Sequence, residues 1–229
     1  MAGMTFAPKS ARGAAVAPLI DHTLLKPDLR EADVVRLCAE ARFYGFASVC
    51  VPPCRIALAR RELIGFPVKA GTVVGFPMGF ATAAAKAAEA ADAVQNGADE
   101  LDMVLCVTAL KDGDAGHVRK DIRGVVAAAA GRTVKVILET CLLTDEEKVR
   151  ACRLAVEAGA GFVKTSTGLA GGGATVEDVR LMRRTVGAAC GVKASGGIRT
   201  LAVALALIEA GATRLGTSSG VAIVTEQTL

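Results

Sequence analysis

The chain has 229 residues, of which 52% are hydrophobic and 22% charged, so it can bury a large core and is not expected to be disordered. Aromatic residues make up only 3% and the net charge of +4 is dispersed, which argues against a nucleic-acid surface of stacking rings and basic runs. The seven cysteines are odd in number and irregularly spaced, so a disulfide framework is not expected and most of them are interpreted as buried small hydrophobes. No apolar run approaches the roughly 18 residues of a membrane span, and we expect a cytoplasmic protein.

Residues 1–18 are Ala-rich with a few basic residues and lack the apolar centre of a signal peptide, and we assign them to an N-terminal extension. From residue 19 onward, short apolar runs alternate with longer amphipathic stretches at a period of about 25 to 30 residues, which is typical of repeated strand–helix units. Eight strands are predicted, at residues 19–24, 46–51, 68–74, 100–105, 134–139, 161–165, 191–195 and 213–217. Seven helices are predicted between them, at residues 31–44, 54–64, 81–96, 116–130, 144–158, 175–186 and 200–209.

Several helix ends carry clear signals. Thr144 followed by Glu147 predicts a capping box at a helix start. Gly97, Gly159 and Gly211 each stand where a helical pattern stops and a strand pattern begins, which indicates glycine C-terminal stops. No linker-like stretch divides the chain, so we expect one domain over residues 19–229.

Eight alternating units in one domain favour a single (β/α)8 TIM barrel. The alternative is an open doubly wound sheet, which normally carries a glycine-rich phosphate turn after its first strand. Here the first predicted strand is followed by Lys26-Pro27-Asp28, which does not have that composition. The barrel is therefore the predicted fold, with its functional residues expected at the C-terminal ends of the strands.

Two lysines stand at matching places in two of these strands. Lys164 and Lys193 are each followed by Ser, Thr or Gly residues that leave room for a ligand. Two ammonium groups aimed at one place repel each other, which lowers the pKa of one of them and yields a neutral amine able to attack a carbonyl. The alternative for each lysine is a structural ion pair, since lysine is seldom buried without a partner.

Carboxylates interrupt other predicted strands. Asp102 alternates with the apolar Leu101 and Met103, and Asp21 lies in the first strand beside His22. A buried carboxylate needs a cationic or hydrogen-bonding partner, so each of them is either a member of an internal ion pair or part of the reacting site.

Three small-residue turns follow the last three strands and suggest a phosphate site built from backbone N–H groups. Their residues are Gly171 and Gly172, Gly196 and Gly197, and Gly216, Ser218 and Ser219. Tight-turn geometry alone is the competing explanation. The two histidines, His22 and His117, are not in a ligand-spaced cluster, so no metal site and no cofactor are expected, and His117 is expected to face solvent.

At these residues the chain resembles the deoxyribose-phosphate aldolase family from about residue 19 to about residue 220. The matching segments are DHTLLK at 21–26, VCVPP at 49–53, VGFP at 74–77, LDMV at 101–104, KVILET at 135–140, KTSTG at 164–168, KASGGIRT at 193–200 and LGTSS at 215–219. Each is modest evidence alone, whereas the order and spacing together are highly specific.

The resemblance implies a metal-free class I aldolase that interconverts 2-deoxy-D-ribose 5-phosphate with D-glyceraldehyde 3-phosphate and acetaldehyde. It implies that Lys164 forms the Schiff base and that Asp102 is the proton donor and acceptor. It further implies that Lys193 is the neighbouring cation and a proton-relay member, with Asp21 as its supporting partner. The implied partners are a small sugar phosphate and an aldehyde, with no nucleic acid and no membrane, and a homo-oligomer is expected, in the first place a dimer.

The chain departs from the family pattern at two places. Cys106 stands where many relatives have Asn, which puts a side-chain hydrogen bond there in doubt but not the lysine chemistry. Some relatives end in a tyrosine that reaches the site, whereas this sequence ends Glu226-Gln-Thr-Leu229. Two other functions stay open on the sequence: a Schiff-base aldolase for a longer ketose, and a catalytically silent barrel that only binds sugar phosphates.

Overall fold

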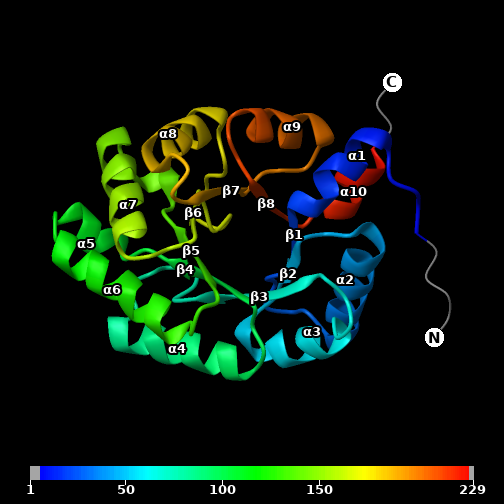
Figure 1. Ribbon diagram of the computed structural model, residues 1–229, viewed down its shortest axis with the longest axis horizontal. Helices are drawn as coiled ribbons and strands as arrows, with labels where there is room; N and C mark the ends of the chain where they lie inside the picture. Colours follow the sequence, from blue (N-terminus) through cyan, green and yellow to red (C-terminus); the bar gives the residue numbers. More distant parts are fainter. Residues whose placement is uncertain (1–5, 227–229) are drawn as a thin grey trace.

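The computed structural model describes residues 6–226, in which eight parallel strands close into a barrel in the order of the chain, β1 to β8 (Figure 1). The strands are β1 (Ile20–Thr23), β2 (Ser48–Cys50), β3 (Lys69–Val74), β4 (Glu100–Val104), β5 (Thr133–Ile137), β6 (Phe162–Lys164), β7 (Gly191–Ser195) and β8 (Arg214–Thr217). This confirms the predicted TIM barrel and excludes the open doubly wound sheet, because β8 pairs with β1.

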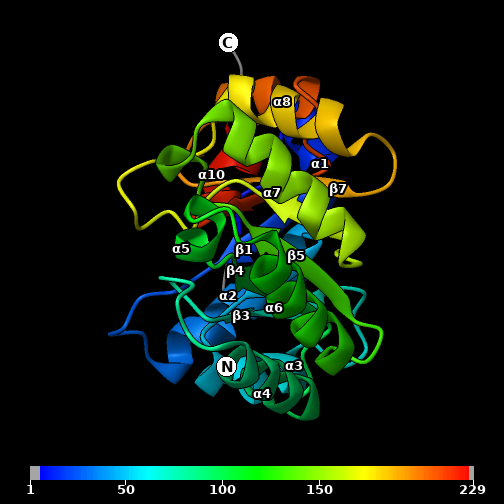
Figure 2. The same cartoon turned by 90° about the vertical axis from the view of Figure 1, so that its left-hand side faces the viewer.

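The helices of the described residues surround this barrel. They are α1 (Ala11–Val16), α2 (Glu31–Tyr44), α3 (Ile56–Glu62), α4 (Ala83–Gln95), α5 (Val107–Lys111), α6 (Ala115–Ala128), α7 (Asp145–Glu157), α8 (Val176–Val186), α9 (Leu201–Glu209) and α10 (Gly220–Thr225), with the 3-10 helices η1 (Ala17–Leu19), η2 (Pro53–Arg55) and η3 (Thr140–Leu142). Neighbouring helices such as α7 and α8 lie side by side in both views (Figures 1 and 2). No helix among residues 6–226 has both the length and the hydropathy needed to cross a membrane.

The strands are buried on both faces. Successive side chains of a strand point alternately toward the helices and toward the inside of the barrel. In β4, Leu101 and Met103 belong to the apolar core, whereas Glu100 and Asp102 are buried polar residues of the other face. Apolar residues of Val, Leu, Ile and Ala type fill the layer between strands and helices. The second face, which points into the barrel, therefore accommodates the charged residues of the site.

The predicted helix ends are confirmed. Thr144 and Glu147 form the capping box at the start of α7. Gly97, Gly159 and Gly211 have φ values of 95°, 90° and 114°, a conformation that glycine adopts without a steric penalty. The predicted seven helices are present, and His117 is exposed near the start of α6, as expected.

Part of the predicted N-terminal extension forms α1 and η1. The backbone N–H of Ser10 donates a hydrogen bond to the carbonyl of Val224 at 2.8 Å, and α1 lies against α10 (Figure 1). Residues 1–5 of the predicted extension and residues 227–229 of the tail without tyrosine lie outside the described residues.

Candidate active site

The two predicted lysines meet on one carboxylate. Lys164 and Lys193 are register partners on the adjacent strands β6 and β7. Lys164 Nζ donates to Asp102 Oδ2 at 2.8 Å, and Lys193 Nζ donates to the same oxygen at 2.7 Å. The structure thus brings together the three residues that the sequence analysis placed at the centre of the chemistry.

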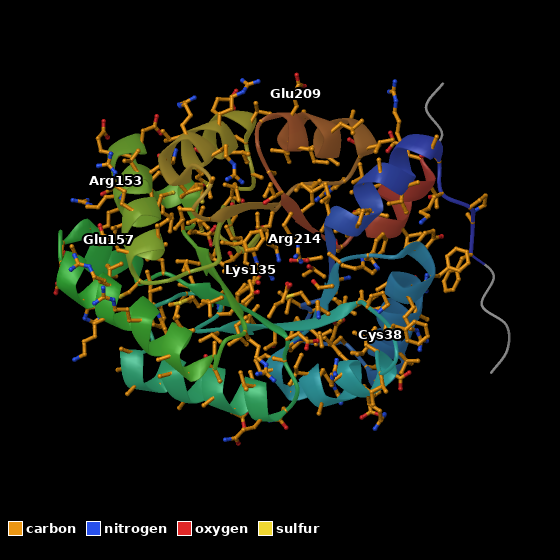
Figure 3. The ribbon with its side chains drawn as sticks, viewed as in Figure 1. Cys38, Lys135, Arg153, Glu157, Glu209 and Arg214 are labelled. Carbon is orange, nitrogen blue, oxygen red and sulfur yellow. The ribbon has the colours of Figure 1, made fainter. Side chains whose placement is uncertain are left out.

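Other strands extend this group into a larger cluster. Lys193 also donates to Asp21, the predicted supporting residue on β1. Lys135 on β5 lies 2.9 Å from Asp102, 2.6 Å from Glu100 and 3.3 Å from Asp21. The barrel cluster, as we name it, consists of Asp21, Glu100, Asp102, Lys135, Lys164, Lys193 and Arg214. Figure 3 shows Lys135 and Arg214 in the middle of the barrel, with Arg153, Glu157 and Glu209 on the outer helices.

The barrel cluster has four cationic side chains and three carboxylates, so it carries one excess positive charge when all are ionised. Among the described residues, Lys135 forms ion pairs with all three carboxylates of the cluster and Lys193 with two of them, whereas Lys164 pairs only with Asp102. A buried excess charge is costly, and it is removed when one lysine loses its proton. Lys164 is the least compensated lysine and therefore the one expected to be neutral.

The pKa directions agree with this count. Burial lowers the pKa of Lys164, and the charge of Lys193 lowers it further, although Asp102 opposes both. Burial also acts to lower the pKa of Lys193, but Asp102 and Asp21 outweigh it and raise that pKa above its ordinary value. The sequence analysis attributed the effect on Lys164 to repulsion alone, whereas burial is its largest cause.

Asp102 is held as a carboxylate. Its burial alone would raise its pKa, but Lys135, Lys164 and Lys193 outweigh burial and keep the pKa well below the ordinary value. A carboxylate so strongly stabilised can orient the two lysines and pass a proton on, but it binds that proton only weakly.

Lys164 opens into a pocket of 280 Å³ at the C-terminal ends of the strands. Of the predicted phosphate residues, Gly196, Gly197, Gly216 and Ser218 line this pocket. Gly171, Gly172 and Ser219 do not line it. A Cβ on Gly172 would lie 2.5 Å from Cβ of Cys141, so this glycine allows two loops to pack closely. Ser219 instead lines a neighbouring cavity next to His22.

Two glycines of the pocket have local packing reasons as well. Gly196 has a φ of 87°, and a Cβ there would lie 2.9 Å from Cα of Gly173. A Cβ on Gly216 would lie 2.9 Å from Cε of Lys193. Gly216 therefore leaves space for the side chain of Lys193, a reason that turn composition alone does not indicate.

Sequence reasoning missed several functional candidates. Lys26 and Arg199 are exposed, line the pocket and form no ion pair within residues 6–226, so their charges are free to meet an anion. Glu100, Lys135 and Arg214 belong to the barrel cluster but were not predicted as site residues. The sequence did contain a signal for two of them. Glu100 lies two residues before Asp102 and therefore on the same face of β4, and Lys135 is the residue on β5 that pairs with Asp102.

No group of three or more metal-ligating His, Cys, Asp or Glu side chains occurs among residues 6–226. Cys106, at the first departure from the family pattern, is buried, and its thiol lies 3.4 Å from the Thr108 hydroxyl. It does not line the pocket that contains Lys164.

Comparisons with known proteins point to one family. A family model described as DeoC/LacD family aldolase matches residues 15–226. The chain is 60% identical over 214 residues to the deoxyribose-phosphate aldolase of Geobacillus sp. (strain WCH70), covering 93% of this chain and 96% of that protein. It is 60% identical over 205 residues to the deoxyribose-phosphate aldolase of Streptococcus pneumoniae serotype 19F (strain G54), covering 90% of this chain and 93% of that protein. Among solved structures, the tetrameric deoxyribose phosphate aldolase of Aeropyrum pernix matches with a TM-score of 0.87 at 35% identity, covering 93% of this chain and 90% of that one.

Proposed function

The chain belongs to the DeoC/LacD family of aldolases, and from this premise we propose that it reversibly cleaves 2-deoxy-D-ribose 5-phosphate to D-glyceraldehyde 3-phosphate and acetaldehyde through a Schiff base on Lys164. Deoxyribose-phosphate aldolases at 60% identity over nearly the whole chain support the reaction. The observation that carries the residue assignment is a buried lysine of lowered pKa that opens into the pocket and shares a carboxylate oxygen with a second, charged lysine.

In the first step, neutral Lys164 attacks the C1 aldehyde of the open-chain sugar, and loss of water gives an iminium. The iminium restores the positive charge that Lys164 gave up, and Asp102 Oδ2 lies beside it to compensate that charge. Lys193, held as an ammonium by Asp21 and Asp102, is placed to donate the proton that the departing oxygen needs.

In the second step, the iminium acts as the electron sink for cleavage of the C2–C3 bond. The C3 hydroxyl loses its proton, the C2–C3 bonding electrons move to the C1–C2 enamine, and C3 becomes the aldehyde of glyceraldehyde 3-phosphate. Asp102, with Lys193 and a bridging water, takes that proton and passes it on. Protonation of the enamine at C2 and hydrolysis then release acetaldehyde and free Lys164.

The far end of the pocket suits the phosphate. Gly196, Gly197 and Ser218 offer a small-residue surface, and Lys26 and Arg199 add two positive charges. Binding the phosphate away from the reacting bond supplies energy for orienting C1 toward Lys164.

We also propose that the protein acts in the cytoplasm as a homodimer. All seven cysteines are free, as suits a reducing compartment. Phe43, Ile64 and Phe66 are large apolar side chains exposed at or just after the ends of α2 and α3, and exposed apolar side chains of this size suit contact with a second copy.

The proposed function predicts a sharp substrate preference. The enzyme should cleave 2-deoxy-D-ribose 5-phosphate and, in reverse, should use acetaldehyde as donor, whereas dihydroxyacetone phosphate should give no product. A coupled assay for glyceraldehyde 3-phosphate measures the first reaction, and chromatography of the products measures the second. Preference for dihydroxyacetone phosphate would indicate an aldolase for a longer ketose, and binding of sugar phosphates without turnover would indicate the silent barrel.

A further inference from the structure

Glu139 is a buried carboxylate in a backbone conformation that its residue type disfavours. It is the second residue after the end of β5. Its backbone has φ 57° and ψ 64°, and the residue is only 3% exposed. The left-handed region costs free energy for a residue with a Cβ, and such residues persist where their surroundings hold them. Among the ion pairs within residues 6–226, none involves Glu139, so no cation explains why a carboxylate is kept there.

The backbone at Glu139 changes the register between β5 and the segment after β6. The N–H of Leu138 donates to the carbonyl of Lys164, and the N–H of Thr140 donates to the carbonyl of Thr165. The two donor residues are separated by two positions in the sequence, whereas the two acceptor residues are adjacent. Glu139 is therefore one extra residue in the segment after β5, as in a β-bulge. Such bulges redirect a side chain, and they are common next to active sites.

The redirected carboxylate holds one residue of the pocket wall. The backbone N–H of Thr167 donates to both carboxylate oxygens at 3.2 Å, and the Thr167 hydroxyl donates to Oε2 at 2.5 Å. The same hydroxyl accepts a hydrogen bond from the N–H of Leu169 at 3.1 Å. Thr167, Gly168 and Leu169 all line the pocket that contains Lys164, so Glu139 fixes this wall through Thr167.

We propose that Glu139 is a positioning residue that sets the pocket wall at residues 167–169 so that the distal part of the sugar phosphate is aligned with Lys164. This inference rests on the proposed aldolase function. It assigns Glu139 no contact with the reacting atoms, because its carboxylate is occupied by Thr167. Its effect should therefore depend on substrate length: large for 2-deoxy-D-ribose 5-phosphate, and small for acetaldehyde, which is short enough to meet Lys164 alone.

The experiment compares Glu139→Gly with Glu139→Gln. Glycine adopts the left-handed conformation freely, so this variant removes the carboxylate without adding strain. Glutamine keeps an oxygen that can accept from Thr167. We expect kcat/KM for 2-deoxy-D-ribose 5-phosphate to fall about 10- to 100-fold in Glu139→Gly, the range for losing hydrogen bonds to a charged group. We expect the Gln variant to stay within about threefold of the parent, since neutral hydrogen bonds are weaker but retained. Trapping of acetaldehyde on Lys164 by borohydride should change by less than about twofold in both.

A second comparison tests whether Glu139 acts through Thr167. The double variant Glu139→Gly/Thr167→Val should lose activity to about the same extent as Glu139→Gly alone, because the two residues form one unit. Thr167→Val alone should lose less, since the backbone N–H of residue 167 can still donate to Glu139. Additive losses would overturn the proposal, as would an equal loss in acetaldehyde trapping or full activity in Glu139→Gly. If Glu139→Gly does not fold, Glu139→Asn takes its place, since Asn tolerates the left-handed region but has a shorter side chain.

The proposed function can fail separately from this inference. If the parent protein neither cleaves the sugar phosphate nor traps acetaldehyde, the aldolase assignment is wrong. Amide hydrogen exchange then still tests the structural part: exchange at Thr167 and Leu169 should be faster in Glu139→Gly than in the parent and close to the parent in Glu139→Gln. Unchanged exchange in both variants would show that Glu139 does not hold this wall.

Discussion

Lys164 differs from the other lysines of the barrel cluster in how few carboxylates it contacts. Within residues 6–226 its only ion-pair partner is Asp102, which it shares with Lys193 and Lys135. Burial disfavours its ammonium form, and the neighbouring charge of Lys193 adds to that effect. The lowered pKa of Lys164 is therefore a consequence of burial together with an uneven charge count, which distinguishes Lys164 from Lys193 despite their similar sequence contexts.

Replacing Lys193 by Leu should shift the pH dependence of the reaction. Lys164 must be neutral to attack, and its neutral fraction grows as pH rises through its pKa. Removing the charge of Lys193 favours the ammonium form of Lys164, so the pKa of Lys164 should rise. The ascending limb of the kcat/KM profile should therefore shift to higher pH, by about one pH unit or more. Turnover near pH 7 should fall sharply. The exposed Lys120→Leu is the matched control, and an unmoved limb in Lys193→Leu would refute this role.

At the scale of elements, the strands and the longer helices were predicted, whereas the shortest helices were not. The helix at 31–44 and the strand at 191–195 are predicted with the bounds that the structure gives to α2 and β7. By contrast, α1, α5 and α10 have five or six residues, which is too short for an apolar period to repeat. Their positions depend on tertiary contacts, as in the close approach of α1 to α10.

The contact between α1 and α10 should be sensitive to a single methyl group. A Cβ on Gly13 would lie 2.1 Å from the carbonyl oxygen of Val224, so Gly13→Ala must push the two helices apart. We expect a loss of about 1–3 kcal/mol in the free energy of unfolding, measured by urea titration. Gly124→Ala in α6 is the control, since its nearest neighbour would be Cβ of Ala87 at 3.9 Å. That variant should gain about 0.5–1 kcal/mol from helix propensity. Similar values for the two variants would contradict the close contact.

At the scale of the whole molecule, closure of the barrel creates what the sequence could not predict in detail. Asp102, Lys164 and Lys193 were predicted because charged residues interrupt apolar strands and match a family pattern. Arg214 was not, because it joins Asp21 and Glu100 only when β8 closes against β1. Gly171 and Gly172 have the composition of a phosphate turn but do not line the pocket, since composition does not determine which way a loop folds.

The buried charges should make the fold sensitive to acid. Asp21 and Asp102 have pKa values far below the ordinary ones, because their cationic partners outweigh burial. Their stabilising effect is fully present above the unfolded-state pKa of about 4 and is lost as pH falls below it toward the folded-state values.

The free energy of unfolding, measured by urea titration at several pH values, should therefore fall steeply below about pH 4. The slope should be smaller in Asp102→Asn, whereas Asp112→Asn, at an exposed site, should keep the parent's slope. Equal slopes in the parent and Asp102→Asn would show that Asp102 does not contribute.

The central claim is that Lys164 is the amine that captures the carbonyl. Borohydride reduction in the presence of acetaldehyde, followed by peptide mass mapping, identifies the modified lysine directly. We predict one ethyl adduct on Lys164, lost in Lys164→Met and formed only slowly in Lys193→Leu near pH 7. An adduct on Lys193, Lys135 or a surface lysine instead of Lys164, or no adduct while the sugar phosphate is still cleaved, would contradict the account.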